Sequence, residues 1–290
     1  MGLNARDQVT GRATGFARRS ALNEVVTGSI VICYRENVDQ LAGILNHESL
    51  NPCIERAQYN NLELQYSSAS RCFLGHRRAW EIASKRDGYT LVCEADFVPC
   101  KGIGGLPTFW PLNRELAWGY LYQGSPRLLW ISPDGFLRGH TAPLVAYVIN
   151  SAVAEIFLKF FDHELTQYRL EDYFTFDAQL QWWVMGRGAE AYIPMRHYGE
   201  HGGRANPEHK LHGLRRAGVH RADNLQAPLA FVPQYAGGSS LAFLKERLIA
   251  RAYGWGRLLT GRWIIDTNVY SRGFSDTAKM YGVGVRRLSF

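Results

Sequence analysis

Two acidic residues directly follow a short apolar run in the first third of the sequence. Residues 89–93 are typical of a buried strand, and Glu94 and Asp96 come immediately after them. In an open α/β sheet, ligands bind outside the carboxyl ends of the strands, where this pair is expected to lie. Carboxylates two residues apart on an extended segment face the same way, so both can bind one Mg²⁺ or Mn²⁺ ion. The alternative is a solvated strand end with two ordinary acids.

A second group of candidate residues lies in a histidine-rich segment, residues 197–209. It contains His197, His201 and three glycines, which exclude a regular helix. His201 can donate to a phosphate or complete a metal shell, and the glycines let the backbone approach a ligand. The spacing of His197 and His201 also leaves a structural zinc site open, and the third alternative is an ordinary surface loop.

Four segments together resemble glycosyltransferase family 25, which includes bacterial lipooligosaccharide galactosyltransferases and collagen galactosyltransferases. They are residues 70–81, 91–97, 141–154 and 176–180. The first carries Gly75 and His76, and the second carries Glu94-Ala95-Asp96 where the family has Glu-Asp-Asp. The middle acid is therefore missing, although the segments occur in the family's order.

The resemblance implies the nucleotide-sugar-binding α/β fold called GT-A. It also implies transfer of a sugar from a nucleoside diphosphate to an acceptor hydroxyl, with inversion at the anomeric carbon. Glu94 and Asp96 would hold the divalent cation, Mn²⁺ or Mg²⁺, on the diphosphate. By analogy, His201 or His197 would be a third metal ligand. His76 would lie near the nucleotide or form a structural bond to the loop after the sheet.

Arginine and acidic side chains supply the remaining candidates. Arg77 and Arg78 match phosphate geometry as part of a cofactor-binding site, although a solvated helix face is equally ordinary. An inverting displacement needs a general base beside the acceptor hydroxyl, and Asp177 is the candidate. Asp177 would also suit the N-terminal cap of a helix. Glu171 and Asp172 are the fallback bases.

Strands and helices are expected to alternate through the first hundred residues. This order predicts βαβ units and an α/β fold with a mainly parallel central sheet. A hairpin is expected at residues 127–137, where Ser-Pro-Asp-Gly at 132–135 suits a tight turn. The expected strands are 29–34, 53–57 and 89–93, and the expected helices are 38–45, 70–84, 151–161 and 176–185.

The positive charge of the chain is concentrated near its C-terminal end. The formal net charge is +7, and residues 245–290 hold nine basic and three acidic side chains. Apolar residues with two tryptophans recur there at helical spacing, which predicts a basic amphipathic helix. Such a helix would contact an anionic membrane surface or pack on the catalytic domain. The expected organisation is a leader over 1–28, a catalytic domain over 29–237 and a basic extension over 238–290.

The composition of the chain limits the cellular compartments and the binding partners that we expect. Five cysteines without a C-x-x-C pair favour free thiols in a reducing compartment. No apolar run reaches the length of a membrane span, so the protein is expected in the cytoplasm or at the inner face of the membrane. Nucleic acid is disfavoured as a partner because the basic tail holds no recognised module.

These observations predict a metal-dependent glycosyltransferase. The expected donor is a nucleotide sugar, with a UDP-sugar favoured, and the expected acceptor is a cell-surface glycan or a lipid-linked glycan. Two alternatives remain open, a zinc-dependent hydrolase that uses the histidine-rich segment and a non-catalytic family member.

Overall fold

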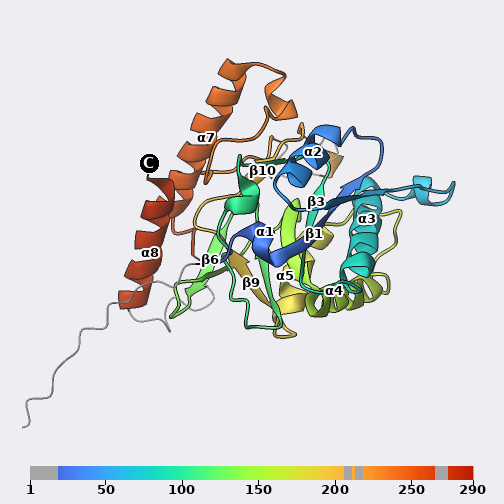
Figure 1. Cartoon of the computed structure of the whole chain (residues 1–290), viewed down its shortest axis with the longest axis horizontal. Helices are drawn as coiled ribbons and strands as arrows, with labels where there is room; N and C mark the ends of the chain where they lie inside the picture. Colours follow the sequence, from blue (N-terminus) through green and yellow to red (C-terminus); the bar gives the residue numbers. More distant parts are fainter. Residues whose placement is uncertain (1–18, 206–210, 213–217, 265–273, 290) are drawn as a thin grey trace, which may run out of the picture.

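Strands and helices alternate from residue 22 to residue 94, as the sequence predicts, and five further strands follow before the next α-helix. The computed structural model describes residues 19–205, 211–212, 218–264 and 274–289 (Figure 1). The strands are β1 (Val26–Cys33), β2 (Pro52–Arg56), β3 (Tyr89–Glu94), β4 (Phe97–Pro99), β5 (Ala117–Tyr120), β6 (Arg127–Ile131), β7 (Leu137–His140), β8 (Ala146–Asn150), β9 (Glu190–Ile193) and β10 (Gly199–His201). The helices are α1 (Leu22–Val25), α2 (Asp39–His47), α3 (Ser68–Ala83), α4 (Ser151–Glu164), α5 (Phe176–Met185), α7 (Ser240–Leu259) and α8 (Phe274–Leu288).

The central sheet has eight strands in the order β2-β1-β3-β8-β5-β9-β7-β6. Strand β1 pairs in parallel with β2 and β3, and β5 pairs in parallel with β9. The other four pairs of neighbours are antiparallel. The α/β class is confirmed, but the expectation of a mainly parallel sheet is corrected, because β8 inserts antiparallel between β3 and β5. The hairpin predicted at 127–137 is confirmed as β6 and β7, with Gly135 at φ 75° in its turn.

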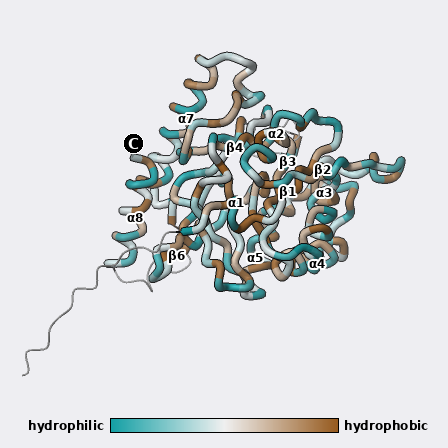
Figure 2. Tube along the Cα trace, viewed as in Figure 1, coloured by the Kyte–Doolittle hydropathy of each residue, from teal (hydrophilic) through white to brown (hydrophobic). Residues whose placement is uncertain are grey.

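Helices cover both faces of the sheet and create two apolar cores. On one face α3, α4 and α5 bury an aromatic cluster in which Phe73 stacks on Phe176 at 4.5 Å between ring centroids. On the other face α2 buries Leu41 and Leu45 against β1 and β3. Figure 2 shows hydrophobic residues concentrated in the central strands. Because both faces are covered, the inner strands are apolar without alternation, as the run before Glu94 indicates.

The two C-terminal helices lie side by side along one edge of the molecule (Figure 1). Leu258 of α7 and Met280 and Val283 of α8 belong to the same apolar core as the aromatic cluster. The region predicted as an extension over 238–290 is therefore packed on the rest of the fold through the inner face of both helices.

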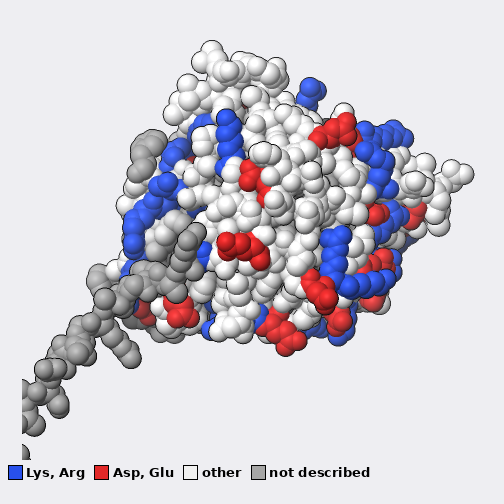
Figure 3. Space-filling view, viewed as in Figure 1, with Lys and Arg blue, Asp and Glu red and all other residues white. Residues whose placement is uncertain are grey.

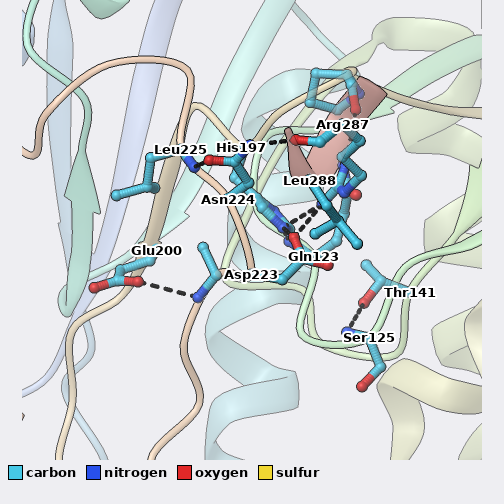
Figure 4. Close-up of polar contacts among 12 residues, drawn as sticks. Gln123, Ser125, Thr141, His197, Glu200, Asp223, Asn224, Leu225, Arg287 and Leu288 are labelled. Atoms are coloured by element: carbon cyan, nitrogen blue, oxygen red, sulfur yellow. Dashed lines mark hydrogen bonds and ion pairs between the residues drawn. The ribbon is translucent and has the colours of Figure 1, made fainter. Parts of the chain in front are cut away.

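A buried polar cluster fastens these helices to the sheet (Figure 4). The carboxylate of Asp223 accepts from Arg287 of α8 at 2.8 Å and from Arg257 of α7 at 2.8 Å. His197 accepts from the Gln123 amide on Nδ1 at 3.1 Å, so its Nε2–H donates to Asp223 at 2.8 Å. Burial and the Arg287 charge lower the pKa of His197 to about 4, so this ring is neutral. Burial opposes ionisation of Asp223, but Arg287, His197 and Arg257 outweigh it and hold its pKa well below the usual range.

The N-terminal segment, the cysteines and the lengths of the helices bear on three further predictions. Strand β1 begins at Val26, inside the segment predicted as a leader, while residues 1–18 lie outside the described residues. All five cysteines are free thiols. No helix among the described residues is long and apolar enough to cross a membrane.

Arg287→Ala is expected to destabilise the protein by about 3–5 kcal/mol, because Asp223 stays buried with one cation fewer. Urea unfolding near neutral pH measures this loss of free energy of unfolding. The pKa of Asp223 is depressed in the folded protein, so the ion pair stabilises above the unfolded value of 3.8, and the deficit should shrink as pH falls below that value. The exposed neighbour Arg286 is the control, since Arg286→Ala should cost less than about 0.5 kcal/mol. Equal effects of both variants would contradict this account.

Candidate functional site

The acidic pair lies at the carboxyl end of β3, where the sequence places it. Glu94 is the last residue of β3, and its amide bonds to the Val145 carbonyl at 2.9 Å just before β8. The chain turns at Ala95 and Asp96 and continues as β4. Both carboxylates are partly exposed, with side-chain exposures of 24% for Glu94 and 27% for Asp96.

His201 reaches this pair because β10 pairs antiparallel with β4. The register sets His201 opposite Phe97, the residue that follows Asp96, and the Gly202 amide donates to the Asp96 carbonyl at 2.7 Å. The backbone then passes so close that a Cβ on Gly203 would lie 2.3 Å from Asp96 Oδ2. The glycines of the histidine-rich segment thus let the chain approach the acidic pair. This segment, expected to be a loop, contains a short strand.

Three predicted ligands come together as a result. Glu94, Asp96 and His201 each offer one atom to a group in which all three atoms lie within 4.8 Å of one another. His201 Nε2 lies 3.1 Å from Asp96 Oδ2. Asp96 Oδ1 and His201 Nδ1 are both buried and have no hydrogen-bond partner among the described residues. Buried polar atoms are nearly always paired, so these two atoms mark a place for a ligand.

His76 lies behind Glu94 and orients it. Its Nε2 is 3.1 Å from Glu94 Oε1, its Nδ1 is 2.8 Å from the Tyr147 hydroxyl, and that hydroxyl accepts from Trp80 Nε1 at 2.7 Å. An indole N–H only donates. A chain of hydrogen bonds therefore runs from Trp80 through Tyr147 and His76 to Glu94. It pairs the Trp80 N–H, the Tyr147 hydroxyl and both nitrogens of His76. His76 is fully buried, and its bonds go to Glu94 and Tyr147 rather than to the loop after the sheet.

The pKa values of the two carboxylates are shifted in opposite directions. Burial raises the pKa of Asp96, and the Glu94 charge raises it further against the opposing effect of His201. Burial also opposes ionisation of Glu94, but the hydrogen bond and charge of His76 and the charge of His201 outweigh it and lower the pKa. Glu94 is thus the fixed negative charge of the site.

A pocket of about 530 Å³ opens in front of this group. Glu94, His201 and Asp177 all line it, although the last comes from α5, a separate element. Asp177 does not cap α5, because Thr175 occupies the cap position and the Asp177 carboxylate accepts only from the Ala178 amide at 2.8 Å. Burial raises the pKa of Asp177 to about 7 against that hydrogen bond, and the Glu94 charge adds to the rise. A pocket of this volume suits a small organic ligand.

Comparisons with known proteins leave the family open. No family model matches the chain, and no curated protein matches it. One similar solved structure is a glycosyltransferase involved in the glycosylation of the major capsid of PBCV-1. The two chains are 9% identical, the match covers 58% of this chain and 81% of that chain, and the TM-score is 0.41. A similarity this low carries no argument about function, so the resemblance to family 25 stays a prediction.

Several predicted residues do not reach the pocket. Arg77 forms an ion pair with Glu81 at 2.9 Å and lies over the Phe161 ring, which places it on the α4 side of α3. Arg78 pairs with Glu63 at 3.6 Å. The cofactor-binding role expected for Arg77 is therefore not supported by its position.

The remaining histidine and the fallback bases also lie elsewhere. His197 is buried against Asp223, so it and His201 are separated and do not form the zinc pair considered from their spacing. Glu171 and Asp172 are exposed and do not line the pocket. Of the candidate bases, the structure places only Asp177 in the pocket wall.

Two pocket residues, Arg204 and Cys72, were missed from the sequence, and a third, His220, was counted only among the clustered histidines without a role of its own. Arg204 and His220 line the pocket, and the His220 and His201 ring centroids are 5.6 Å apart. Both follow the glycine-rich turn, where no regular periodicity indicates which side chains converge. Cys72 lines the pocket too, and its thiol donates to Glu94 at 3.7 Å. Its position one helical turn before His76 on α3 is the signal that could have identified it.

Asp177→Asn is expected to change the pH dependence of stability. The pKa of Asp177 is raised in the folded protein, so ionisation costs stability progressively as pH rises from about 4 to 7. The Asp177→Asn variant has no ionisable group at this position, so it does not lose stability in this way. In buffer with a chelator, its Tm should match the wild type near pH 4 and exceed it by about 2–4 °C at pH 8.

Asp172→Asn removes a charge from the exposed loop before α5 and is the matched control. A Tm difference for Asp177→Asn that does not grow with pH, or that grows equally for the control, would show that Asp177 is ordinarily solvated.

Proposed function

We propose that the protein is a metal-dependent glycosyltransferase with a GT-A-like fold. It moves a sugar from a nucleoside diphosphate sugar, with UDP favoured, to a hydroxyl of a glycan or glycolipid acceptor. The observation that carries the proposal is the convergence of Glu94, Asp96 and His201 beside a pocket that Glu94 and His201 line, together with a third carboxylate, Asp177, that lines the same pocket from a separate element.

The residues at the end of β3 fit a divalent cation. Two carboxylates and one imidazole suit Mn²⁺ or Mg²⁺, and the unpartnered Asp96 Oδ1 and His201 Nδ1 leave ligand atoms available. Bound there, the ion would neutralise the negative charge that develops on a departing diphosphate. His76 and Tyr147 act behind the ligands, since their hydrogen bonds fix the orientation of Glu94.

Positive side chains complement a diphosphate on the same side of the pocket. Arg204 and His220 line the wall near His201, where a guanidinium and an imidazole can donate to phosphate oxygens. The lining also contains Pro143, Leu144 and Phe174, apolar side chains suited to the flat faces of a base or a sugar ring. The pocket thus offers charge to one half of a nucleotide sugar and apolar contact to the other.

Asp177 is the proposed general base. With a pKa of about 7 it is about half ionised at neutral pH, and the ionised form is a stronger base than an ordinary carboxylate. It would take the proton of the acceptor hydroxyl as that oxygen attacks the anomeric carbon. The bond from that carbon to the diphosphate breaks on the opposite face, which gives inversion.

Nucleotide binding tests the metal site directly. UDP with Mn²⁺ at about a hundred times its dissociation constant should raise the Tm by about 5–10 °C. The double variant Glu94→Ala, Asp96→Ala should abolish the shift, because it removes two of the three charged or polar ligands. Asp87→Ala, an exposed acid just before β3, is the matched control and should keep the shift.

The proposal fails if neither UDP nor another nucleoside diphosphate shifts the Tm in the presence of Mn²⁺. A shift without turnover of any nucleotide sugar would instead identify a non-catalytic member that binds the same ligand.

Asp177→Asn should lower kcat for nucleotide-sugar turnover by about 10²–10⁴-fold and leave the UDP–Mn²⁺ shift in place. In the wild type, kcat should fall on the acid side with an apparent pKa near 7, since the protonated carboxyl cannot accept a proton. The pH profile of kcat measures both effects, with Asp172→Asn as control. Unchanged kcat and an unchanged profile would assign the base to another group.

A further inference from the structure

The outer face of α7 carries exposed leucines that no element of the described part of the chain covers. Leu241, Leu244, Leu248 and Leu259 are 77%, 55%, 64% and 81% exposed, whereas Ala250, Gly254 and Leu258 on the inner side are buried. The first three recur at positions i, i+3 and i+7, so they form one stripe. In Figure 1 the N-terminal half of α7 projects beyond the rest of the molecule. Figure 3 shows that projecting end without acidic side chains in this view.

A cavity of about 610 Å³ adjoins the inner edge of this stripe. It lies between α7 and the segment 224–232, and its wall combines basic with apolar side chains. The basic ones are Lys101, Arg247 and Arg251, and the apolar ones include Phe231, Val232 and Phe243. Val232 is half exposed, so apolar surface continues from the cavity toward solvent. The stripe and the cavity together present hydrocarbon beside positive charge.

The charges around α7 favour an anionic partner. Lys101 and Lys245 are exposed and have no ion-pair partner among the described residues. The acid nearest to them on α7, Glu246, is paired with Arg221, and Glu200 is paired with Arg247 at 2.5 Å. A second copy docked through the same face would bring like charges together. An anionic bilayer supplies hydrocarbon for the leucines and negative headgroups for the lysines.

We propose that α7 docks the protein on an anionic phospholipid bilayer. Leu241, Leu244 and Leu248 enter the headgroup boundary while Lys245 and Lys101 contact lipid phosphates. The ion pair from Arg247 to Glu200 connects α7 to β10, whose last residue is His201, so docking would hold the pocket near lipid-linked acceptors. Binding to the bilayer needs neither nucleotide nor metal, so its failure and a failure of the proposed glycosyl transfer are distinguishable.

Vesicle co-sedimentation of the full chain tests the proposal. Wild-type protein should sediment with phosphatidylcholine–phosphatidylglycerol vesicles and stay in solution with pure phosphatidylcholine. The double variant Leu244→Ser, Leu248→Ser should lower the vesicle partition coefficient by about tenfold or more. Lys245→Glu should lower it by more than about fivefold, and added salt should weaken wild-type binding.

The control is the double variant Leu62→Ser, Leu165→Ser, which removes two exposed leucines away from α7 and should bind like the wild type. Circular dichroism and Tm verify that every variant is folded. Absence of wild-type sedimentation, equal binding to neutral vesicles, or unchanged binding of the α7 variant would each overturn the proposal. Light scattering tests the alternative that the stripe binds a second copy of the chain. A wild-type dimer that does not bind vesicles, and that the α7 variant converts to a monomer, would overturn the proposal in favour of that alternative.

Discussion

The arrangement of the site depends on holding two carboxylates of like charge side by side at the edge of a sheet. Glu94 and Asp96 leave β3 two residues apart, and each is partly removed from water. Such a pair is costly unless cationic or hydrogen-bonding groups compensate it. His76 does so from behind and His201 from the facing strand. The fold around the site, from α3 to β10, positions these two imidazoles.

The C-terminal helices support His201 indirectly, through contacts with residues that lie near it in the chain. His201 ends β10, and the preceding residue, Glu200, is buried and bonded to Arg247 of α7, the Tyr235 hydroxyl and the Ala222 amide. Four residues before His201, His197 is anchored to Asp223 and through it to α8. Of the nine basic side chains after residue 244, Arg247, Arg257 and Arg287 are therefore paired with internal acids. Net charge alone could not distinguish those inward arginines from the exposed Lys245.

The parts of the site that depend on the local pattern of apolar residues can be predicted from the sequence. The run before Glu94 had to be a strand because it is continuously apolar, and α5 begins at Phe176 as its spacing predicts. Strand β8 was missed because Ala146–Asn150 runs without a break into α4, and these residues were considered only as part of the segment that leads into that helix. The role of His76 was left open because it depends on Tyr147, which is distant in sequence. Arg204 and His220 converge through loop geometry, which no periodicity encodes.

The placement of Arg287 has a consequence for how the chain acquires its structure. Asp223 is the buried acid that anchors His197, yet its main counter-charge, Arg287, comes from the last turn of α8. During synthesis, residues 19–264 emerge from the ribosome before that arginine exists. Until then Asp223 has Arg257 of α7 as its cation and lacks Arg287, so the polar cluster around it is incomplete while the central strands are already present. Synthesis of the α8 segment, rather than formation of the central strands, then completes the cluster that holds His197, four residues before His201.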